Sequence, residues 1–272
     1  MLRVRLAVIL LLVPLGFWAI ASGGWMYMLV ITGFLAQAAS EYGKLFANDG
    51  HRPAQFLLVV GVILLSVCRF LFGFEHSALV ISILLLAAMA WHEFDFERGA
   101  PNSGTDFAIT VTGILYVGWL GSYLISLRQL GDGEWWLLLM FTGIWLADGA
   151  AYMLGRTFGK HKLSRRLSPN KTWEGYLGGL LIGSLSSMGL ATIWALGASP
   201  DSGINAVAGL VVGFLVALVA PLGDFGISMF KREVEAKDSS QLIPGHGGML
   251  DRMDSWLWAG VIAYYLVPLL QL

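Results

Sequence analysis

The feature that most constrains this chain is a series of long apolar runs separated by short polar stretches. The nine runs cover residues 6–21, 25–40, 54–73, 77–91, 106–126, 135–154, 175–197, 204–223 and 256–271. About twenty helical residues cross a bilayer core, and continuous rather than alternating runs indicate helices instead of a barrel. Only 13% of the 272 residues are charged, too few to cover a soluble protein. The sequence therefore predicts an all-α polytopic integral membrane protein with about nine transmembrane helices.

The distribution of Lys and Arg predicts the orientation of these helices. With the N-terminus in the cytoplasm, fifteen of the 17 cations fall on the cytoplasmic side, and only Arg69 and Arg128 fall outside. Because cytoplasmic loops are enriched in Lys and Arg, we expect a cytoplasmic N-terminus and an external C-terminus. The first 21 residues also resemble a cleavable signal peptide, but a second apolar run follows directly and favours an uncleaved helix.

Polar chemistry is concentrated in the second half of the chain. We expect residues 1–130, with about five helices, to be a scaffold, and residues 131–272, with about four, to carry the catalytic cytoplasmic loops 155–174 and 224–255. These loops hold ten of the basic residues. Three of the ten are expected only to enforce the topology: Lys162, Arg165 and Arg166. Small residues between 178 and 189 predict a close helix–helix contact.

A carboxylate and a helix start mark the first loop. Asp148 lies about two turns inside the cytoplasmic end of its helix, where a charge is costly and usually lines a polar cavity. Tyr152 follows one turn later on the same face. Thr172 is placed to cap the next helix, with Glu174 in its first turn. A helix N-terminus beside Lys171 and hydroxyl groups predicts a seat for a phosphate.

The second loop, residues 224–255, contains more acidic residues that could bind a metal ion. Within 31 residues it combines four aspartates and four cations: Asp224, Asp238, Asp251, Asp254, Lys231, Arg232, Lys237 and Arg252. Oxygen ligands without a Cys cluster suit Mg²⁺ rather than Zn²⁺, and cations would neutralise bound phosphates. Gly247 and Gly248 would let backbone N–H groups approach an anion. The loop predicts Mg²⁺-dependent phosphoryl or nucleotidyl transfer to a membrane lipid; a solvated charged loop is the alternative.

The same residues resemble a known family, the bacterial phosphatidate cytidylyltransferases (CDP-diacylglycerol synthases). The resemblance is sharp over residues 145–255 and only compositional over 1–140. Its main motif is Ser228-x-Phe230-Lys231-Arg232, then Lys237-Asp238-x-Ser240, then Ile243-Pro244-x-His246-Gly247-Gly248-Met249-x-Asp251-Arg252-Met253-Asp254. Upstream matches are Asp148, Tyr152, Arg156 and the pattern Ser168-Pro169-x-Lys171-Thr172-Trp173.

The resemblance implies an activity: cytidylyl transfer from CTP to phosphatidate, giving CDP-diacylglycerol and pyrophosphate in phospholipid biosynthesis. It implies Mg²⁺ as cofactor, with Mn²⁺ as a substitute, and allows a monovalent cation such as K⁺. The implied partners are CTP, phosphatidate and membrane lipids, without nucleic acid, and a homodimer is compatible with it. The implied location is the bacterial cytoplasmic (inner) membrane, with the active site facing the cytoplasm.

The resemblance also implies site residues in three groups. The metal ligands are Asp224 and Asp251. The catalytic residues are Asp224, Asp251, Lys237, Asp254, Ser228 and His246. The substrate-binding residues are Ser168, Lys171, Thr172, Lys231, Arg232, Asp238, Gly247, Gly248, Arg252, Asp148, Tyr152 and Arg156. Alternatively, each metal-binding aspartate pairs with a local cation: Asp251 with Arg252, and Asp224 with Lys231.

Two other functions stay open at this point. A CTP- or ATP-dependent membrane lipid kinase, of the polyprenol type, would share the metal chemistry but transfer the γ-phosphoryl group. An anion transporter would place its charges near the bilayer midplane, often in inverted repeats, whereas these charges gather at one face. The remaining acidic residues at cytoplasmic helix ends are expected to be solvated: Glu41, Glu93, Asp95 and Glu97.

Overall fold

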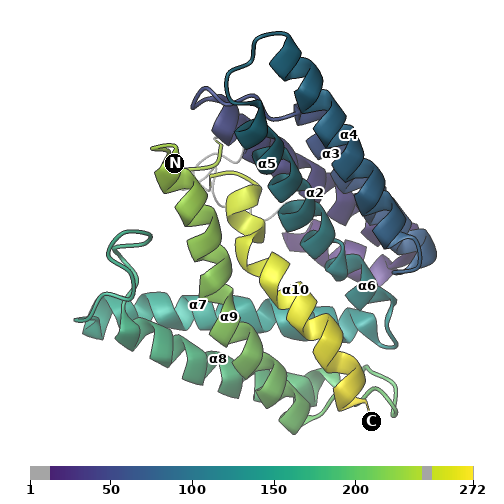
Figure 1. Ribbon diagram of the computed structural model, residues 1–272. Coiled ribbons are helices and arrows are strands. Elements are labelled where there is room, and N and C mark those ends of the chain that lie inside the picture. The colour runs from purple at the N-terminus through teal and green to yellow at the C-terminus, as the bar shows by residue number, and fades with distance from the viewer. Residues whose placement is uncertain (1–12, 241–246, 272) are drawn as a thin grey trace. The chain divides into compact units, whose positions relative to one another are not determined.

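The computed structural model describes residues 13–240 and 247–271, and their regular structure is helical, without a β-strand (Figure 1). The chain divides into two compact units, and each unit is assembled from two separate stretches of sequence. Unit 1 comprises Met1–Ser126 and Phe230–Met253, and unit 2 comprises Leu127–Met229 and Asp254–Leu272. The expected division into a scaffold, 1–130, and a catalytic half, 131–272, stays a prediction.

Unit 1 is built mainly from the N-terminal helices. They are Val13–Ser22, α2 (Gly24–Ala47), α3 (Gln55–Phe72), α4 (Ser77–Glu97), α5 (Ser103–Gly113) and the π-helix η1 (Ile114–Trp119). Small residues let these helices approach closely, since a Cβ on Gly118 would meet the buried Val62 side chain at 3.0 Å. The short helix α6 (Tyr123–Gln129) then carries the chain from unit 1 into unit 2.

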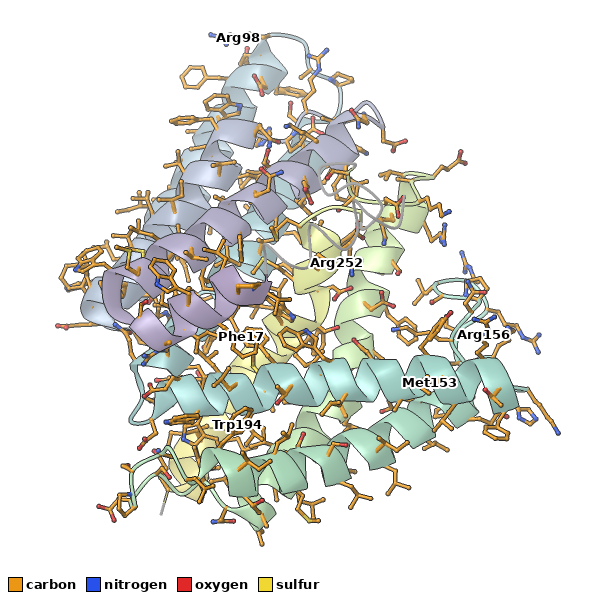
Figure 2. The ribbon with its side chains drawn as sticks, turned by 180° about the vertical axis from the view of Figure 1, so that it is seen from behind. Phe17, Arg98, Met153, Arg156, Trp194 and Arg252 are labelled. Atoms are coloured by element: carbon orange, nitrogen blue, oxygen red, sulfur yellow. The ribbon has the colours of Figure 1, made fainter. Side chains whose placement is uncertain are left out.

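Unit 2 contains α7 (Gly133–Phe158), α8 (Trp173–Trp194) and most of α9 (Ala206–Glu233) and α10 (Leu250–Leu270). Helices α7 and α8 run antiparallel and side by side: Met153 and Arg156 lie toward one end of the pair and Trp194 toward the other (Figure 2). The predicted close contact of residues 178–189 is confirmed, because a Cβ on Gly183 would lie 2.7 Å from the Ala147 side chain.

In the described part of the chain, seven helical segments are long and apolar enough to cross a membrane. They are Gln55–Phe72, Ser77–Glu97, Ser103–Gln129, Gly133–Phe158, Trp173–Trp194, Ala206–Glu233 and Leu250–Leu270. Within the described residues, each of the nine predicted runs coincides with helix, and the first two fall short of this criterion. Helix α2 is long enough, but Gln37, Ser40 and Glu41 interrupt its apolar stretch. The chain is thus a helical integral membrane protein, and the count of nine spans is not confirmed.

The ends of several helices lie beyond the predicted runs. Helix α4 continues to Glu97, six residues past the apolar run that ends at residue 91, and α7 continues to Phe158. The backbone hydrogen bonds of a helix do not stop where its side chains become polar, so hydropathy marks the apolar part and not the helix ends. The signal-peptide alternative falls largely on residues 1–12, outside the described residues.

Candidate active site

Asp251 lies in the first turn of α10 and accepts four hydrogen bonds within unit 1. Lys231 Nζ donates to its Oδ1 at 2.7 Å. The Ser239 N–H and hydroxyl donate to Oδ2, both at 2.9 Å, and the Gly248 N–H donates to Oδ2 at 3.1 Å. The carboxylate side chain is 8% exposed, so its charge is balanced by Lys231 and by fixed donors rather than by water. We call Asp251, Lys231, Ser239, Gly248 and Glu41 the Asp251 cluster.

Glu41, near the end of α2, and Ser239 are the two members that the sequence did not predict as site residues. Glu41 is 1% exposed, and the expectation that it is solvated is wrong. Its Oε2 accepts hydrogen bonds from the Leu250 N–H at 2.9 Å and from the Ser239 hydroxyl at 3.1 Å. Its Oε1 accepts from the Ser240 hydroxyl at 2.8 Å and from Gln37 Nε2 at 3.1 Å. A helix from the N-terminal part therefore binds the predicted second loop directly.

The glycine pair of the second loop lies against carboxylates of the chain itself. Gly247 has a φ of 79°, which an L side chain rarely adopts. A Cβ on Gly248 would overlap the Ser239 hydroxyl and the Glu41 carboxylate. The sequence predicted that N–H groups here approach an anion, and the Gly248 N–H does so, but the anion is Asp251. A role for these glycines in binding a substrate stays a prediction.

A second group of charges lies in unit 2, and we call Asp224, Lys171 and Asp254 the Asp224 cluster. Lys171 Nζ pairs with Asp224 Oδ2 at 2.7 Å and also lies 5.2 Å from the Phe225 ring centre. Asp254 belongs to this cluster because its carbonyl group lies against Gly223, the residue before Asp224. Asp254 Oδ1 accepts from the Ser255 N–H at 2.5 Å and its hydroxyl at 3.1 Å. The cluster thus contains two carboxylates, one of which pairs with its lysine.

Close packing of α9 against α10 brings these two carboxylates together. A Cβ on Gly223 would overlap the Asp254 carbonyl group, so only glycine allows this approach directly before Asp224. The Ser255 hydroxyl donates to the Ala220 carbonyl at 3.2 Å and ties the two helices at the same level. The contact between the two backbones therefore fixes the positions from which the Asp224 and Asp254 side chains extend.

The Asp224 cluster fits a Mg²⁺ site better than the Asp251 cluster does. In the described part of the chain, no three His, Cys, Asp or Glu side chains converge as a metal site, so an ion here would depend on fewer protein ligands. Two neighbouring carboxylates with one cation leave an excess of negative charge, and Mg²⁺ is commonly held by one or two carboxylates plus phosphate oxygens and water. Asp251, by contrast, would have to exchange one of its four donors for a metal ion.

The ion-pair partners differ from the predicted alternative. Lys231 pairs with Asp251, and Lys171 pairs with Asp224. The prediction paired Asp251 with Arg252 and Asp224 with Lys231, its closest candidates in sequence, and it is wrong in both cases. The two aspartates expected to share a metal ion lie in different units, each described by itself. Their joint role stays a prediction.

The loop between α7 and α8 holds Lys171 in place. Thr172 caps α8, as predicted, by accepting the Gly175 N–H at 3.2 Å. Glu174 accepts from the His161 backbone N–H at 3.2 Å and contacts its imidazole at 2.6 Å. Hydrogen bonds between His161 and Glu174 therefore join the two ends of the loop close to Lys171. The Thr172 cap uses the Gly175 N–H, and phosphate binding at this helix start stays a prediction.

The other predicted site residues are found in both units. Ser228 is buried and Ser168 half-buried, whereas the rest of the described ones are exposed: Asp148, Tyr152, Arg156, Arg232, Lys237, Asp238 and Arg252. Arg156 Nη1 donates to the Tyr152 hydroxyl at 3.3 Å. His246 lies outside the described residues. None of their predicted roles is tested by these positions.

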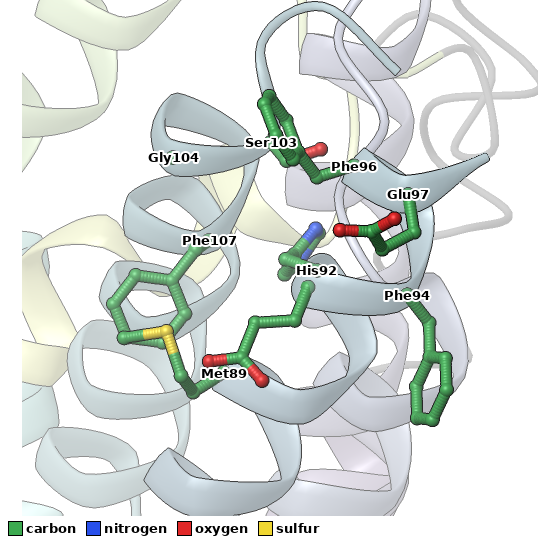
Figure 3. A pocket seen from close by; sticks show the side chains of 9 residues that line it. Met89, His92, Phe94, Phe96, Glu97, Ser103, Gly104 and Phe107 are labelled. Atoms are coloured by element: carbon green, nitrogen blue, oxygen red, sulfur yellow. The ribbon is translucent and has the colours of Figure 1, made fainter. Parts of the chain in front are cut away.

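Unit 1 also has a pocket between α4 and α5, of about 540 Å³ (Figure 3). Its lining includes the buried His92, whose Nε2 lies 2.9 Å from Thr110 Oγ1, and the exposed carboxylates Glu93 and Glu97. No predicted site residue lines this pocket. The candidate chemistry therefore belongs to the two clusters.

Fold and clusters together define a helical membrane protein whose acidic and basic groups are suited to a phosphate-rich substrate and a divalent cation. The chain matches the model of a family described as "Cytidylyltransferase family" over residues 3–270. It therefore belongs to the cytidylyltransferase family and is a CTP-dependent nucleotidyltransferase.

Named relatives point the same way. The chain is 32% identical to "Phosphatidate cytidylyltransferase" of Synechocystis sp., over 95% of this chain and 94% of the relative. It is 34% identical to the protein of the same name from Staphylococcus haemolyticus, over 71% of this chain and 69% of the relative. It is 30% identical to "Phosphatidate cytidylyltransferase 4, chloroplastic" of Arabidopsis thaliana, over 91% and 68%.

Proposed function

We propose that this protein transfers the cytidylyl group of CTP to phosphatidate, giving CDP-diacylglycerol and pyrophosphate for phospholipid biosynthesis. The family match over residues 3–270 and the names of the relatives support this reaction. The observation that carries the chemistry is the two Lys–Asp pairs, each at 2.7 Å, in or beside the two polar loops. Such groups suit a donor with several phosphates and a lipid with one.

The reaction asks for alignment and charge neutralisation more than for proton transfer. An oxygen of the phosphatidate phosphate attacks the α-phosphorus of CTP in line, and pyrophosphate leaves with the electrons of the broken bond. Because the nucleophile is already an anion, no strong general base is needed. We assign phosphate binding to Lys171, Lys231, Arg232 and Lys237, whose cationic groups can neutralise the triphosphate.

For the cofactor we propose Mg²⁺, with Mn²⁺ as a substitute, held by Asp224 and its neighbour Asp254. Asp251 is kept as a proposed ligand on the strength of the sequence motif, and a metal ion there would replace one of its four donors. When bound, the ion supplies positive charge beside the phosphates of CTP. Charge balance supports this choice, since the Asp224 cluster contains two carboxylates and one lysine.

We also propose the finer topology: nine spans in the cytoplasmic (inner) membrane, an N-terminus and an active site in the cytoplasm, and an external C-terminus. The split of fifteen cations against two supports it. The two helices that fall short of a full span, Val13–Ser22 and α2, are neighbours. If both helices cross the membrane, or if neither does, every later loop stays on the same side of the membrane.

The topology is tested by cysteine labelling in intact cells, after replacement of Cys68. The exposed Asn170, in the loop before α8, is changed to Cys, and the exposed Glu75, between α3 and α4, provides the matched outside control. We expect an impermeant thiol reagent to label Glu75→Cys and to spare Asn170→Cys. Ready labelling of Asn170→Cys from outside would overturn the proposed topology.

The reaction itself is tested with the purified protein, phosphatidate, Mg²⁺ and CTP labelled at the α- or the γ-phosphorus. Cytidylyl transfer moves the α-label into the lipid and leaves the γ-label in pyrophosphate. A lipid kinase would move the γ-label into the lipid and leave the α-label in CDP. The second pattern would replace the proposed function with the kinase.

A further inference from the structure

Glu41 is a buried carboxylate in a part of the chain to which the sequence assigned no site residue. An ionised carboxylate buried away from water is costly unless its oxygens are well bonded. Glu41 is 1% exposed, and its two oxygens accept four hydrogen bonds from one backbone N–H, two hydroxyls and one amide. This arrangement is specific, because three of the four donors belong to the second polar loop.

The donors from that loop come from two separate points of the sequence. Ser239 and Ser240 lie at one end of the stretch, and Leu250, the first residue of α10, lies at the other. One carboxylate therefore holds both points against α2. Gly248 lies between them without a side chain, and a Cβ there would overlap the Glu41 carboxylate.

Ser239 connects Glu41 to Asp251. Its hydroxyl lies 3.1 Å from Glu41 Oε2 and 2.9 Å from Asp251 Oδ2, and its N–H donates to Asp251 at 2.9 Å. A hydroxyl has one proton and can donate it to only one of the two carboxylates at a time. Ser239 thus lies between the two carboxylates, and a shift of Ser239 away from Glu41 would move two of the four donors of Asp251.

We propose that Glu41 is a positioning residue for the transferase reaction: it holds Ser239, Ser240 and Leu250 against α2 and, through Ser239, fixes the orientation of Asp251. This rests on the role of Asp251 in the proposed function. A merely structural role for Glu41 would stabilise α2 or the fold as a whole, without a specific effect on Asp251. The positioning role and the structural role differ in how much turnover the conservative variant Glu41→Gln restores.

The test compares Glu41→Ala, Glu41→Gln and the matched control Glu97→Gln, an exposed glutamate on α4 in the same unit. Lost hydrogen bonds to a charged group correspond to roughly tenfold or more in turnover, so we expect that loss for Glu41→Ala. Glu41→Gln keeps an oxygen that can accept the Leu250 N–H, and it should recover most of the turnover. Glu97→Gln should match the wild type.

A readout independent of activity is hydrogen exchange of the Leu250 amide in the purified protein. Its N–H donates to Glu41, so its exchange should be faster in Glu41→Ala and close to normal in Glu41→Gln. Amides of α8 in unit 2 should not change. Wild-type protection of Leu250 in Glu41→Ala would overturn the proposal, whatever the turnover.

A double-mutant cycle with Ser239→Ala tests the connection to Asp251. If Glu41 acts through Ser239, the double variant should lose little more turnover than the worse single variant. Fully additive losses would overturn that connection. The proposed role of Asp251 is tested separately by Asp251→Asn: wild-type turnover there would remove Asp251 from the reaction, while the Leu250 exchange result would still report on Glu41.

Discussion

The Asp251 cluster and the Asp224 cluster both combine one lysine with two carboxylates, but these groups are held differently. Each contains a Lys–Asp pair at 2.7 Å and a second carboxylate. Asp251 is 8% exposed and has three further donors, two of them backbone N–H groups. Asp224 is 28% exposed, and Lys171 is its one partner among the described residues. The comparison teaches that a Lys–Asp pair can be enclosed by fixed donors or left accessible, depending on the surrounding donors.

The difference follows from local backbone structure. In unit 1, the residues before α10 turn their N–H groups and hydroxyls toward Asp251, and Glu41 holds them there. In unit 2, Asp224 lies on α9 and Asp254 lies on α10, and these two helices are in close contact at Gly223. A cation that joins Asp224 needs to displace only Lys171, which would then be free to contact a phosphate.

Removal of divalent cations should have the largest effect of all. In excess EDTA we expect turnover to fall below detection, because the negative charges of CTP, phosphatidate and the Asp224 cluster would remain unneutralised. Added Mg²⁺ or Mn²⁺ should restore it. Full turnover in EDTA would remove the metal ion from the mechanism and, with it, the contrast between the clusters.

Asp224→Asn and Asp251→Asn should each lower turnover by roughly a hundredfold or more, because each change keeps the shape and removes the charge. The double variant should lose little more than the worse single one, since groups that act together are not additive. Raised Mg²⁺ should restore Asp224→Asn more than Asp251→Asn, because a metal ion at Asp251 has to replace one of four donors.

One outcome would contradict the proposed roles of Asp224 and Asp251. If each aspartate is only an ion-pair partner, its loss costs about 0–1 kcal/mol, and activity survives. Near-wild-type turnover of folded Asp251→Asn at saturating CTP would exclude Asp251 from the site.

Lys171→Ala and Lys237→Ala should weaken turnover about ten- to a hundredfold, the value of one charge-assisted contact of about 1.5–3 kcal/mol. Both should remain folded, because neither side chain is buried in the core. Lys171→Ala should also change the Mg²⁺ concentration for half-maximal rate, since Lys171 pairs with Asp224, whereas Lys237→Ala should not. Unchanged kinetics in either variant would show that the lysine has no role in the reaction and only helps to orient the loop in the membrane.

Arg165→Ala and Arg166→Ala should have the smallest effect, within about twofold in turnover, because exposed charges away from a site contribute little. Both are exposed in the same loop as Lys171 and are expected only to enforce the topology. A loss as large as that of Lys171→Ala would show that the whole loop, and not only the Asp224 cluster, binds phosphate.

Features set by local sequence were predictable. The apolar runs marked the position of every described helix, and Thr172 was identified as a cap from its place before Glu174. Helix ends were not predictable from hydropathy, because charged residues such as Glu97 continue the α-helical hydrogen bonding.

Features set by distant residues were not predictable. Glu41 is buried by partners 198 to 209 residues away, and a single sequence does not reveal them. One local signal was present: Gln37 and Glu41, four residues apart, place two polar groups on one face of an apolar helix, as at a polar contact inside a membrane protein. The ion-pair partners were missed for the same reason, since Lys171 lies 53 positions before Asp224.

Mn²⁺ binding, followed by electron paramagnetic resonance in the purified protein, tests the assignment of the metal ion to the Asp224 cluster most directly. We expect Asp224→Asn to weaken Mn²⁺ binding by roughly tenfold or more, since one of two neighbouring carboxylates is lost. The control Glu97→Gln, exposed on α4, should bind Mn²⁺ as the wild type does. Wild-type Mn²⁺ binding by Asp224→Asn would contradict the assignment.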